Sequence, residues 1–202
     1  AKAQIFSEDI RFGGRQHLGV GDEVTVRDLL LASLVGSDNS ATAALVRLSG
    51  MPRGEFIAKM NEMGASMGMQ NTTFVDSTGL HIGNRSIVND IVRLLNETMK
   101  NDVIQNATQQ SSVQIIGSSG RVYFIESTNE LLNTFINRDP YKLVGGKTGF
   151  LPEAGYCLGS IFSEDSKREI VVVVLGSESN QGRFQDVKAL AAWAYKTFDW
   201  QD

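Results

Sequence analysis

Three extended runs near the C-terminus constrain the fold most. They cover residues 142–148, 155–163 and 169–176, and the last contains five consecutive β-branched residues. A run of this kind is typical of a central strand. We therefore expect antiparallel strands in the second half of the chain, closed by an amphipathic helix over 184–198 whose inward face includes Leu190 and Phe198.

Helical patterns dominate the first half. Thr25 is predicted to be the N-cap of a first apolar helix. The expected helices cover 26–35, 40–49, 53–63 and 87–100. A hairpin over 112–126 and a short helix over 128–137 precede the three strands. Together these patterns predict a single domain over 1–202 of the α+β class, in which helices cover an antiparallel sheet beside a helical lobe. A cleft is expected where the lobe meets the sheet.

Charge and composition exclude several classes of protein. The net charge is −4 at pH 7, whereas a nucleic-acid-binding protein needs a basic stripe, so we expect no nucleic acid partner. Every apolar run is far too short to span a bilayer. Cys157 is the only cysteine, and neither His17 nor His81 has a second ligand at metal-binding spacing. We therefore expect no internal disulfide, no metal and no other cofactor.

The segment Gly145-Gly146-Lys147-Thr148-Gly149 is the first candidate for chemistry. A lysine beside a threonine combines a point charge with a directional donor, which suits a carboxylate or a phosphate. A phosphate-binding loop would need glycine where Tyr141 stands and a helix after the motif, so we disfavour nucleotide binding. Two alternatives remain for this segment alone. It is either a Lys-Thr-Gly triplet on a strand edge, as in penicillin-binding enzymes, or a glycine-rich strand start with a solvated lysine.

A second triplet, Ser37-Asp38-Asn39, lies between two predicted helices. Its residue types are the best helix N-caps, so by itself it needs no catalytic role. Paired with Lys147-Thr148-Gly149, however, it places one motif on a helical loop and the other on a sheet edge. These are the two walls of a serine acyl-transfer cleft of the class that carries Ser-x-x-Lys, Ser-x-Asn and Lys-Thr-Gly.

Longer segments extend this likeness from about Ser7 to Phe198. The segments are Gly21-Asp22-Glu23-Val24-Thr25-Val26-Arg27-Asp28-Leu29-Leu30, Phe74-Val75-Asp76-Ser77-Thr78-Gly79-Leu80, and Gly145–Phe150 followed by Ala154-Gly155-Tyr156. In their order and spacing the chain resembles the low-molecular-mass penicillin-binding proteins, the serine-type D-alanyl-D-alanine carboxypeptidases of the peptidase S11 kind. The resemblance implies the penicillin-binding transpeptidase or β-lactamase-like fold.

The resemblance also implies roles for single residues. Ser37 would pass a proton between the lysine partner of the nucleophile and the leaving amine. The amide of Asn39 would bind the peptide group of the substrate. The backbone N–H of Phe150 would be one of two oxyanion donors. Lys147 would supply positive potential to the terminal carboxylate of the substrate. Thr148 would hydrogen-bond the same carboxylate, and Gly149 and Arg183 would complete the substrate-binding set. For Arg183 the alternative is a solvated arginine at the end of a helix.

One element of the family pattern is missing from these residues. No serine stands three positions before any lysine, so the sequence contains no Ser-x-x-Lys nucleophile motif. We therefore expect an incomplete domain whose N-terminal Ser-x-x-Lys segment is absent, and an isolated chain that is inactive. The alternative is a relative that is inactive by nature.

The resemblance implies an enzymatic function, which requires the missing motif. When complete, the domain would remove the terminal D-alanine from peptidoglycan stem peptides through an acyl-enzyme, and β-lactams would inhibit it. Cleavage of D-alanine cross-links and non-catalytic binding of wall peptides stay open as alternatives. The expected location is periplasmic or extracytoplasmic, with possible peripheral membrane association through a segment that this sequence does not contain.

Overall fold

The structure is a computed structural model that describes residues 1–198 and 200. The domain predicted over 1–202 therefore ends on residues outside the described part. The helices are α1 (Val26–Leu34), α2 (Asn39–Leu48), α3 (Arg53–Ser66), α4 (Val88–Thr98), α5 (Asp102–Thr108) and α6 (Asn180–Thr197), with short 3-10 turns at Ser7–Asp9, Glu130–Asn133 and Phe135–Asn137. The strands are β1 (Lys2–Gln4), β2 (Glu23–Thr25), β3 (Ser112–Ile116), β4 (Val122–Glu126), β5 (Tyr141–Leu151), β6 (Gly155–Glu164) and β7 (Arg168–Ser177).

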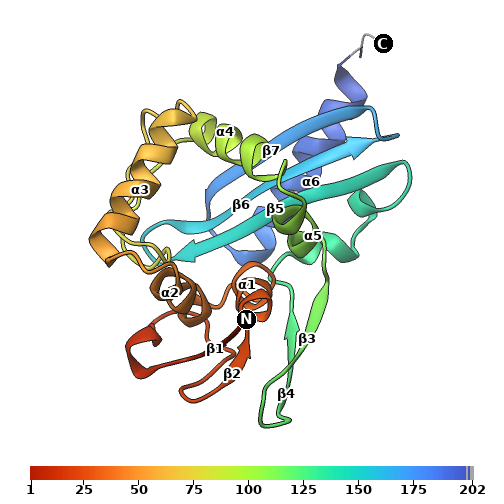
Figure 1. The fold of residues 1–202 in the computed structure, drawn as a ribbon. Helices are drawn as coiled ribbons and strands as arrows, with labels where there is room; N and C mark the ends of the chain where they lie inside the picture. The colour runs from red at the N-terminus through yellow and green to blue at the C-terminus, as the bar shows by residue number, and fades with distance from the viewer. Residues whose placement is uncertain (199, 201–202) are drawn as a thin grey trace.

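The main sheet is antiparallel and has the order β5-β6-β7 (Figure 1). Because side chains alternate along a strand, each face of the sheet carries its own set of apolar residues. One face packs Leu143, Leu158 and Phe162 against Phe184 and Val187 of α6. The other face packs against α4 and α5. The expectation of an α+β fold with a helix-covered antiparallel sheet is confirmed.

Glycine lets the covering helices approach the sheet closely. A Cβ atom on Gly145 would collide with the sulfur of Met99 and lie 2.8 Å from the hydroxyl of Thr108. A Cβ on Gly159 would lie 2.8 Å from Leu95 of α4. Since real Cβ atoms do not come this near to other heavy atoms, a larger residue at either position would force these side chains to move, and glycine in β5 and β6 lets α4 and α5 lie this close.

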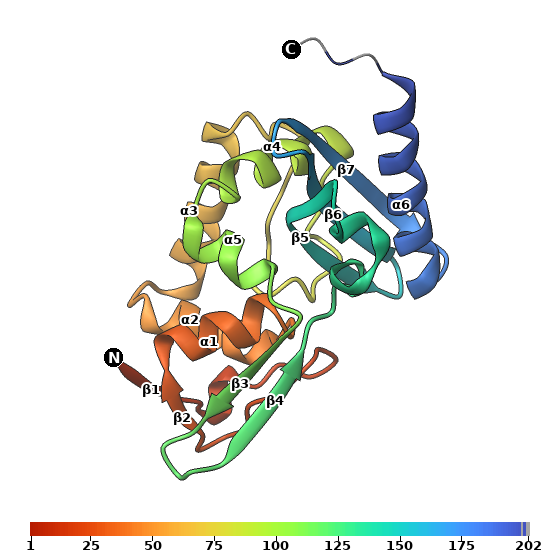
Figure 2. The ribbon, with the colours of Figure 1, turned by 90° about the vertical axis from the view of Figure 1, so that its right-hand side faces the viewer.

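The second lobe has a separate core beneath the sheet. Its buried residues come from α1, α2, the β1–β2 pair and the β3–β4 hairpin, and include Leu29, Val35, Ile115 and Ile125. Figure 2 shows the hairpin running along this lobe, away from the C-terminal end of α6. The predicted helix 26–35 is present as α1, with Thr25 accepting a hydrogen bond from the Asp28 backbone as its N-cap.

Two expectations about the C-terminal half were wrong. The β-branched run of β7 was expected in a central strand, but among the described residues β7 pairs only with β6 and lies at the sheet edge. Helices cover both of its faces, and burial on two faces produces such a run without a second neighbouring strand. Leu190 and Phe198 were expected to face inward but are 44% and 54% exposed, because only a narrow stripe of α6 packs on the sheet.

Candidate active site

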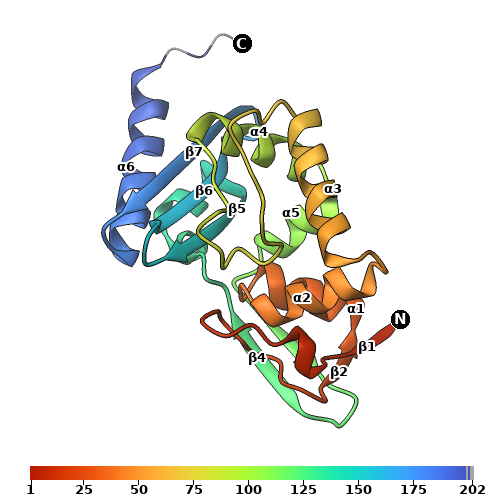
Figure 3. The same ribbon diagram turned by 90° about the vertical axis from the view of Figure 1, so that its left-hand side faces the viewer.

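A cavity of about 670 Å³ lies between the sheet and the helical lobe. Its walls come from the loop before α2, the second half of β5, the turn 13–15, the segment 78–80 and the start of α6. Figure 3 shows β5 and the long segment before α4 on the side of the molecule where the lobe meets the sheet. All seven residues singled out in the sequence line this one cavity: Ser37, Asn39, Lys147, Thr148, Gly149, Phe150 and Arg183.

Ser37 and Lys147 meet across the cavity. They are 110 residues apart in the sequence, yet Lys147 Nζ donates a hydrogen bond to Ser37 Oγ at 2.7 Å. A second hydrogen bond runs from Lys147 Nζ to the carbonyl oxygen of Thr148 at 3.2 Å. An ammonium group has three N–H donors, so one remains for a ligand. The two motifs therefore form a single constellation.

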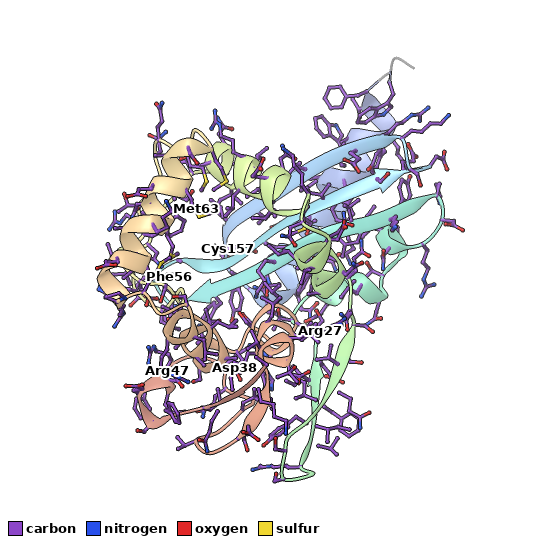
Figure 4. The ribbon with its side chains drawn as sticks, in the orientation of Figure 1. Arg27, Asp38, Arg47, Phe56, Met63 and Cys157 are labelled. Carbon is purple, nitrogen blue, oxygen red and sulfur yellow. The ribbon has the colours of Figure 1, made fainter. Side chains whose placement is uncertain are left out.

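The loop that carries Ser37 is held by its neighbour Asp38, which is labelled at the start of α2 in Figure 4. The carboxylate of Asp38 caps α2 by accepting from Ala41 N and also accepts from the backbone N–H groups of His17 and Leu18. Ser37 itself has φ of 58°, a left-handed conformation that non-glycine residues rarely adopt. The capping interpretation of the triplet thus applies to Asp38, while Ser37 is turned into the cavity. A strained backbone at such a position is common in functional sites.

Asn39 joins two loops that form the cavity walls. Its Oδ1 accepts from the backbone N–H of Arg15 at 2.9 Å, and its Nδ2 donates to the carbonyl of Thr78 at 2.7 Å. The segment around Thr78 is fixed in turn by the buried carboxylate of Asp76, which accepts from Thr78 and from the Leu80 backbone. Burial alone would raise the pKa of Asp76, but these hydrogen bonds outweigh it and lower the pKa below its usual value. One N–H of the Asn39 amide remains for a ligand.

The rim of β5 carries the remaining predicted residues. The hydroxyl of Thr148 is 2.6 Å from that of Thr128, which sequence reasoning did not single out. The carbonyl of Gly149 accepts from Arg183 at 2.9 Å. Phe150 stacks on Tyr156 with a ring separation of 4.3 Å. These contacts fix the end of β5 against β6 and α6.

Arg183 is buried in the first turn of α6. Besides Gly149, its guanidinium donates to the carbonyl of Cys157 and to Oδ1 of Asn180, and its charge lies 5.4 Å from the ring centre of Tyr156. Burial, together with Arg15, lowers the pKa of Arg183, although Glu130 opposes this. Arg183 therefore holds the end of the β5–β6 pair and contributes positive charge to the cavity. The alternative interpretation of Arg183 as a solvated residue at a helix end was wrong, because the side chain is buried.

The cavity is positively charged in an acidic protein. Lys147, Arg183 and Arg15 line it, and none of its lining residues in the described part of the chain is acidic. Burial, with smaller contributions from the two arginines, lowers the pKa of Lys147 to about 8. A site of this kind favours anions.

Sequence reasoning missed several residues of the cavity. Arg15 lines the cavity although it belongs to no predicted element, and Thr128 lines it from a segment predicted as a short helix, whereas 3-10 turns form at 130–133 and 135–137. Neither residue lies in a motif, so the sequence offered only the charge of Arg15 after two glycines as a signal. Within the described residues, no group of His, Cys, Asp and Glu side chains is arranged to hold a metal ion. None of the helices in this part combines the length and apolarity that a membrane crossing requires.

The sequence is similar to those of a known family of peptidases. The model of a peptidase family, Peptidase S11, described as D-alanyl-D-alanine carboxypeptidase, matches residues 9–179. A D-alanyl-D-alanine endopeptidase of Haemophilus influenzae is 34% identical over 151 residues, which are 75% of this chain and 50% of that protein. The D-alanyl-D-alanine carboxypeptidase DacF of Bacillus subtilis is 28% identical over 93% of this chain and 47% of its own length.

The fold has solved counterparts as well. The crystal structure of the Streptomyces K15 DD-transpeptidase superposes with a TM-score of 0.84 at 26% identity, covering 97% of this chain and 79% of that one. The penicillin-binding type of fold expected from the sequence is thereby confirmed. The chain spans about half the length of the curated relatives that it matches.

Proposed function

Because the chain belongs to the D-alanyl-D-alanine carboxypeptidase family of peptidases, we propose that it forms the substrate-binding part of a serine-type D-Ala-D-Ala carboxypeptidase domain. The substrate is the stem peptide of peptidoglycan, and β-lactams inhibit the complete domain. Catalysis uses a serine nucleophile from a Ser-x-x-Lys segment that these 202 residues do not contain. The observation that carries the proposal is the hydrogen bond between Lys147 and Ser37 across a cationic cavity.

The contacts of Ser37 support its role in proton transfer. Since Lys147 donates to Ser37 Oγ, the hydroxyl hydrogen of Ser37 is directed at another acceptor. In the acylation step the nucleophile attacks the carbonyl of the penultimate D-alanine, and the C–N bond to the terminal D-alanine breaks. The proton of the nucleophile reaches the leaving nitrogen through Ser37, and water later hydrolyses the ester. The backbone N–H of Phe150 is proposed as one oxyanion donor for both steps.

The rim of β5 supports binding of the terminal carboxylate. The third N–H of Lys147 and the hydroxyl of Thr148 are proposed to hold it, with Gly149 allowing the peptide to approach the strand. A Cβ on Gly149 would meet only the side chain of Cys157, at an ordinary 3.8 Å. Asn39 is proposed to bind the peptide group of the substrate through its remaining N–H. We also propose an extracytoplasmic location for the protein.

Labelling with a fluorescent penicillin tests the proposal. We expect no covalent label on the 202-residue chain. A longer product of the same gene that includes a Ser-x-x-Lys segment should be labelled, and Lys147→Ala in that product should abolish the label. A strong label on the isolated chain would contradict the absent nucleophile. A longer product that binds stem peptides but never acylates would instead support a non-catalytic binding function.

Cleavage of cross-links is the second candidate. It is favoured by the relative with 34% identity, which is named an endopeptidase. The same cavity would then accept a leaving amine that belongs to a second stem peptide. Incubation of the longer product with a D-alanine cross-linked dimer and with a pentapeptide distinguishes the two activities by which product appears first.

A further inference from the structure

The charge of the cavity exceeds what one terminal carboxylate can neutralise. Three cationic side chains line it, from Arg15, Lys147 and Arg183, and its described lining contains no acidic residue. Glu130 lies outside this lining, but its charge raises the pKa of Arg183 and so offsets part of that positive charge. One carboxylate bound at Lys147 would still leave Arg15 without a counter-charge from the described lining of the cavity.

The three cations differ in how far their side chains are already used. Lys147 donates to Ser37 and to a backbone carbonyl, and Arg183 donates to two carbonyls and to Asn180. The guanidinium of Arg15 has no hydrogen bond, ion pair or cation–π contact with the described part of the chain, and the residue is exposed. Its five N–H donors are therefore available to a ligand.

The backbone of Arg15 is nevertheless fixed. Its N–H donates to Asn39 Oδ1 at 2.9 Å, and its carbonyl accepts from Asn39 N at 3.0 Å. It also forms a parallel bridge with Asp38. The side chain thus extends from a fixed backbone on the helical-lobe wall of the cavity that Lys147 and Thr148 also line. The free guanidinium is a planar fork of donors that matches the geometry of a carboxylate.

We propose that Arg15 is a specificity-determining residue that binds a second carboxylate of the peptide, in the residue preceding D-alanyl-D-alanine. The preferred substrates are then peptides with two free carboxylates near the scissile bond. This inference rests on the proposed function, because it assumes that the terminal carboxylate occupies Lys147 and Thr148. A cavity of about 670 Å³ lies in the range that encloses a drug-sized ligand, so a tripeptide end fits within reach of both walls.

Binding of two matched peptides to the 202-residue chain tests the inference without any chemical step. The peptides are acetyl-L-Glu-D-Ala-D-Ala and acetyl-L-Gln-D-Ala-D-Ala, which differ only by a carboxylate in place of a carboxamide. Titration calorimetry at low ionic strength should show the Glu peptide binding about fivefold more tightly, as expected for one partly exposed Arg–carboxylate pair. Arg15→Gln should abolish this preference and leave the affinity for the Gln peptide within about twofold.

Arg27→Gln is the matched control. Arg27 is an exposed arginine near the start of α1, labelled in Figure 4, and it does not line the cavity. This variant should keep the preference for the Glu peptide. Equal binding of both peptides to the original chain, or a preference that survives Arg15→Gln, overturns the inference and leaves the proposed function intact. Failure of both peptides to bind overturns the proposed function and the inference with it.

Discussion

At the scale of single residues, Lys147 is the side chain of the cavity whose charge changes near physiological pH. Its pKa is lowered to about 8 by burial and by two neighbouring arginines. A peptide carboxylate is fully ionised throughout this range, so the affinity for acetyl-L-Gln-D-Ala-D-Ala should be constant below pH 7 and fall progressively above pH 8. Calorimetric titration across pH 6 to 9.5 measures the change. Lys147→Met should bind more weakly, with no decline above pH 8; a decline in that variant would assign the titration to another group.

The lowered pKa of Lys147 also affects the stability of the folded chain. A lysine in an ion pair has a raised pKa and stabilises the fold when protonated, whereas protonated Lys147 destabilises it. The folded chain holds the Lys147 proton less tightly than the unfolded chain, whose lysines have the ordinary pKa of 10.5. The protonated lysine therefore costs the free chain stability at neutral pH, and this penalty diminishes as pH rises from about 8 through 10.5. A bound anion offsets the cost, so ligand binding and stability are coupled at this residue.

Residues in short motifs could be predicted from the sequence, and residues outside them could not. Ser37 and Lys147 were found because each belongs to a triplet with a known chemical use. Arg15 and Thr128 reach the cavity only through the fold, by the hydrogen bonds that tie Arg15 to Asn39 and Thr128 to Thr148. Such contacts leave no periodic or spacing signal in the chain.

At the scale of elements, the N-terminus of α2 positions the loop that carries Ser37. Asp38 is completely buried and accepts three backbone hydrogen bonds, from Ala41, His17 and Leu18. Asp38→Ala removes a cap and leaves two further backbone N–H groups without a partner. We expect it to lower the free energy of unfolding by about 3 kcal/mol, as measured by urea denaturation.

Ser179→Ala is the control for this prediction. Ser179 caps α6 through one exposed hydrogen bond, to Gly182 N at 2.9 Å. Its loss should cost only about 1 kcal/mol. Equal losses in the two variants would mean that Asp38 acts as an ordinary cap, and that its bonds to the loop at 17–18 add nothing to stability.

Elements with strong local signals matched their predictions, and those set by packing did not. The hairpin predicted over 112–126 is present as β3 and β4, since alternation and a Gly-Ser-Ser-Gly turn define both strands. Helix α5 was missed, because its seven residues are too few to show a helical period, although Asn101 caps it. The segment 128–137 was predicted as one helix but contains two 3-10 turns. The side chain of Asn129 caps the first of them by accepting a hydrogen bond from Leu131 N.

At the scale of the whole molecule, the cavity lies between the sheet and the helical lobe, and the β7 edge of the sheet is open. The β7 edge has no partner strand among the described residues. Beside it lies an apolar groove of about 480 Å³, lined by Val88, the start of β7, Leu190 and Trp193. The strand pattern of β7 led to the expectation of a central strand because both faces of the strand are packed. Sequence periodicity reports which faces are buried, and carries no information on whether an edge is paired.

This edge and groove should make the isolated chain self-associate. A long apolar edge strand beside an exposed apolar patch favours pairing with a second copy. Trp193 is the largest exposed residue of the groove, 54% exposed on α6, so Trp193→Lys should raise the concentration at which dimers form about tenfold, with little loss of stability. Sedimentation velocity over a concentration series measures this.

Phe12→Lys is the control. Phe12 is an aromatic residue that is 93% exposed in a turn away from the groove, so this variant should leave the dimerisation unchanged. A chain that stays monomeric at all concentrations, or equal effects of the two variants, would show that the open edge is protected by its own twist and charge rather than by a partner.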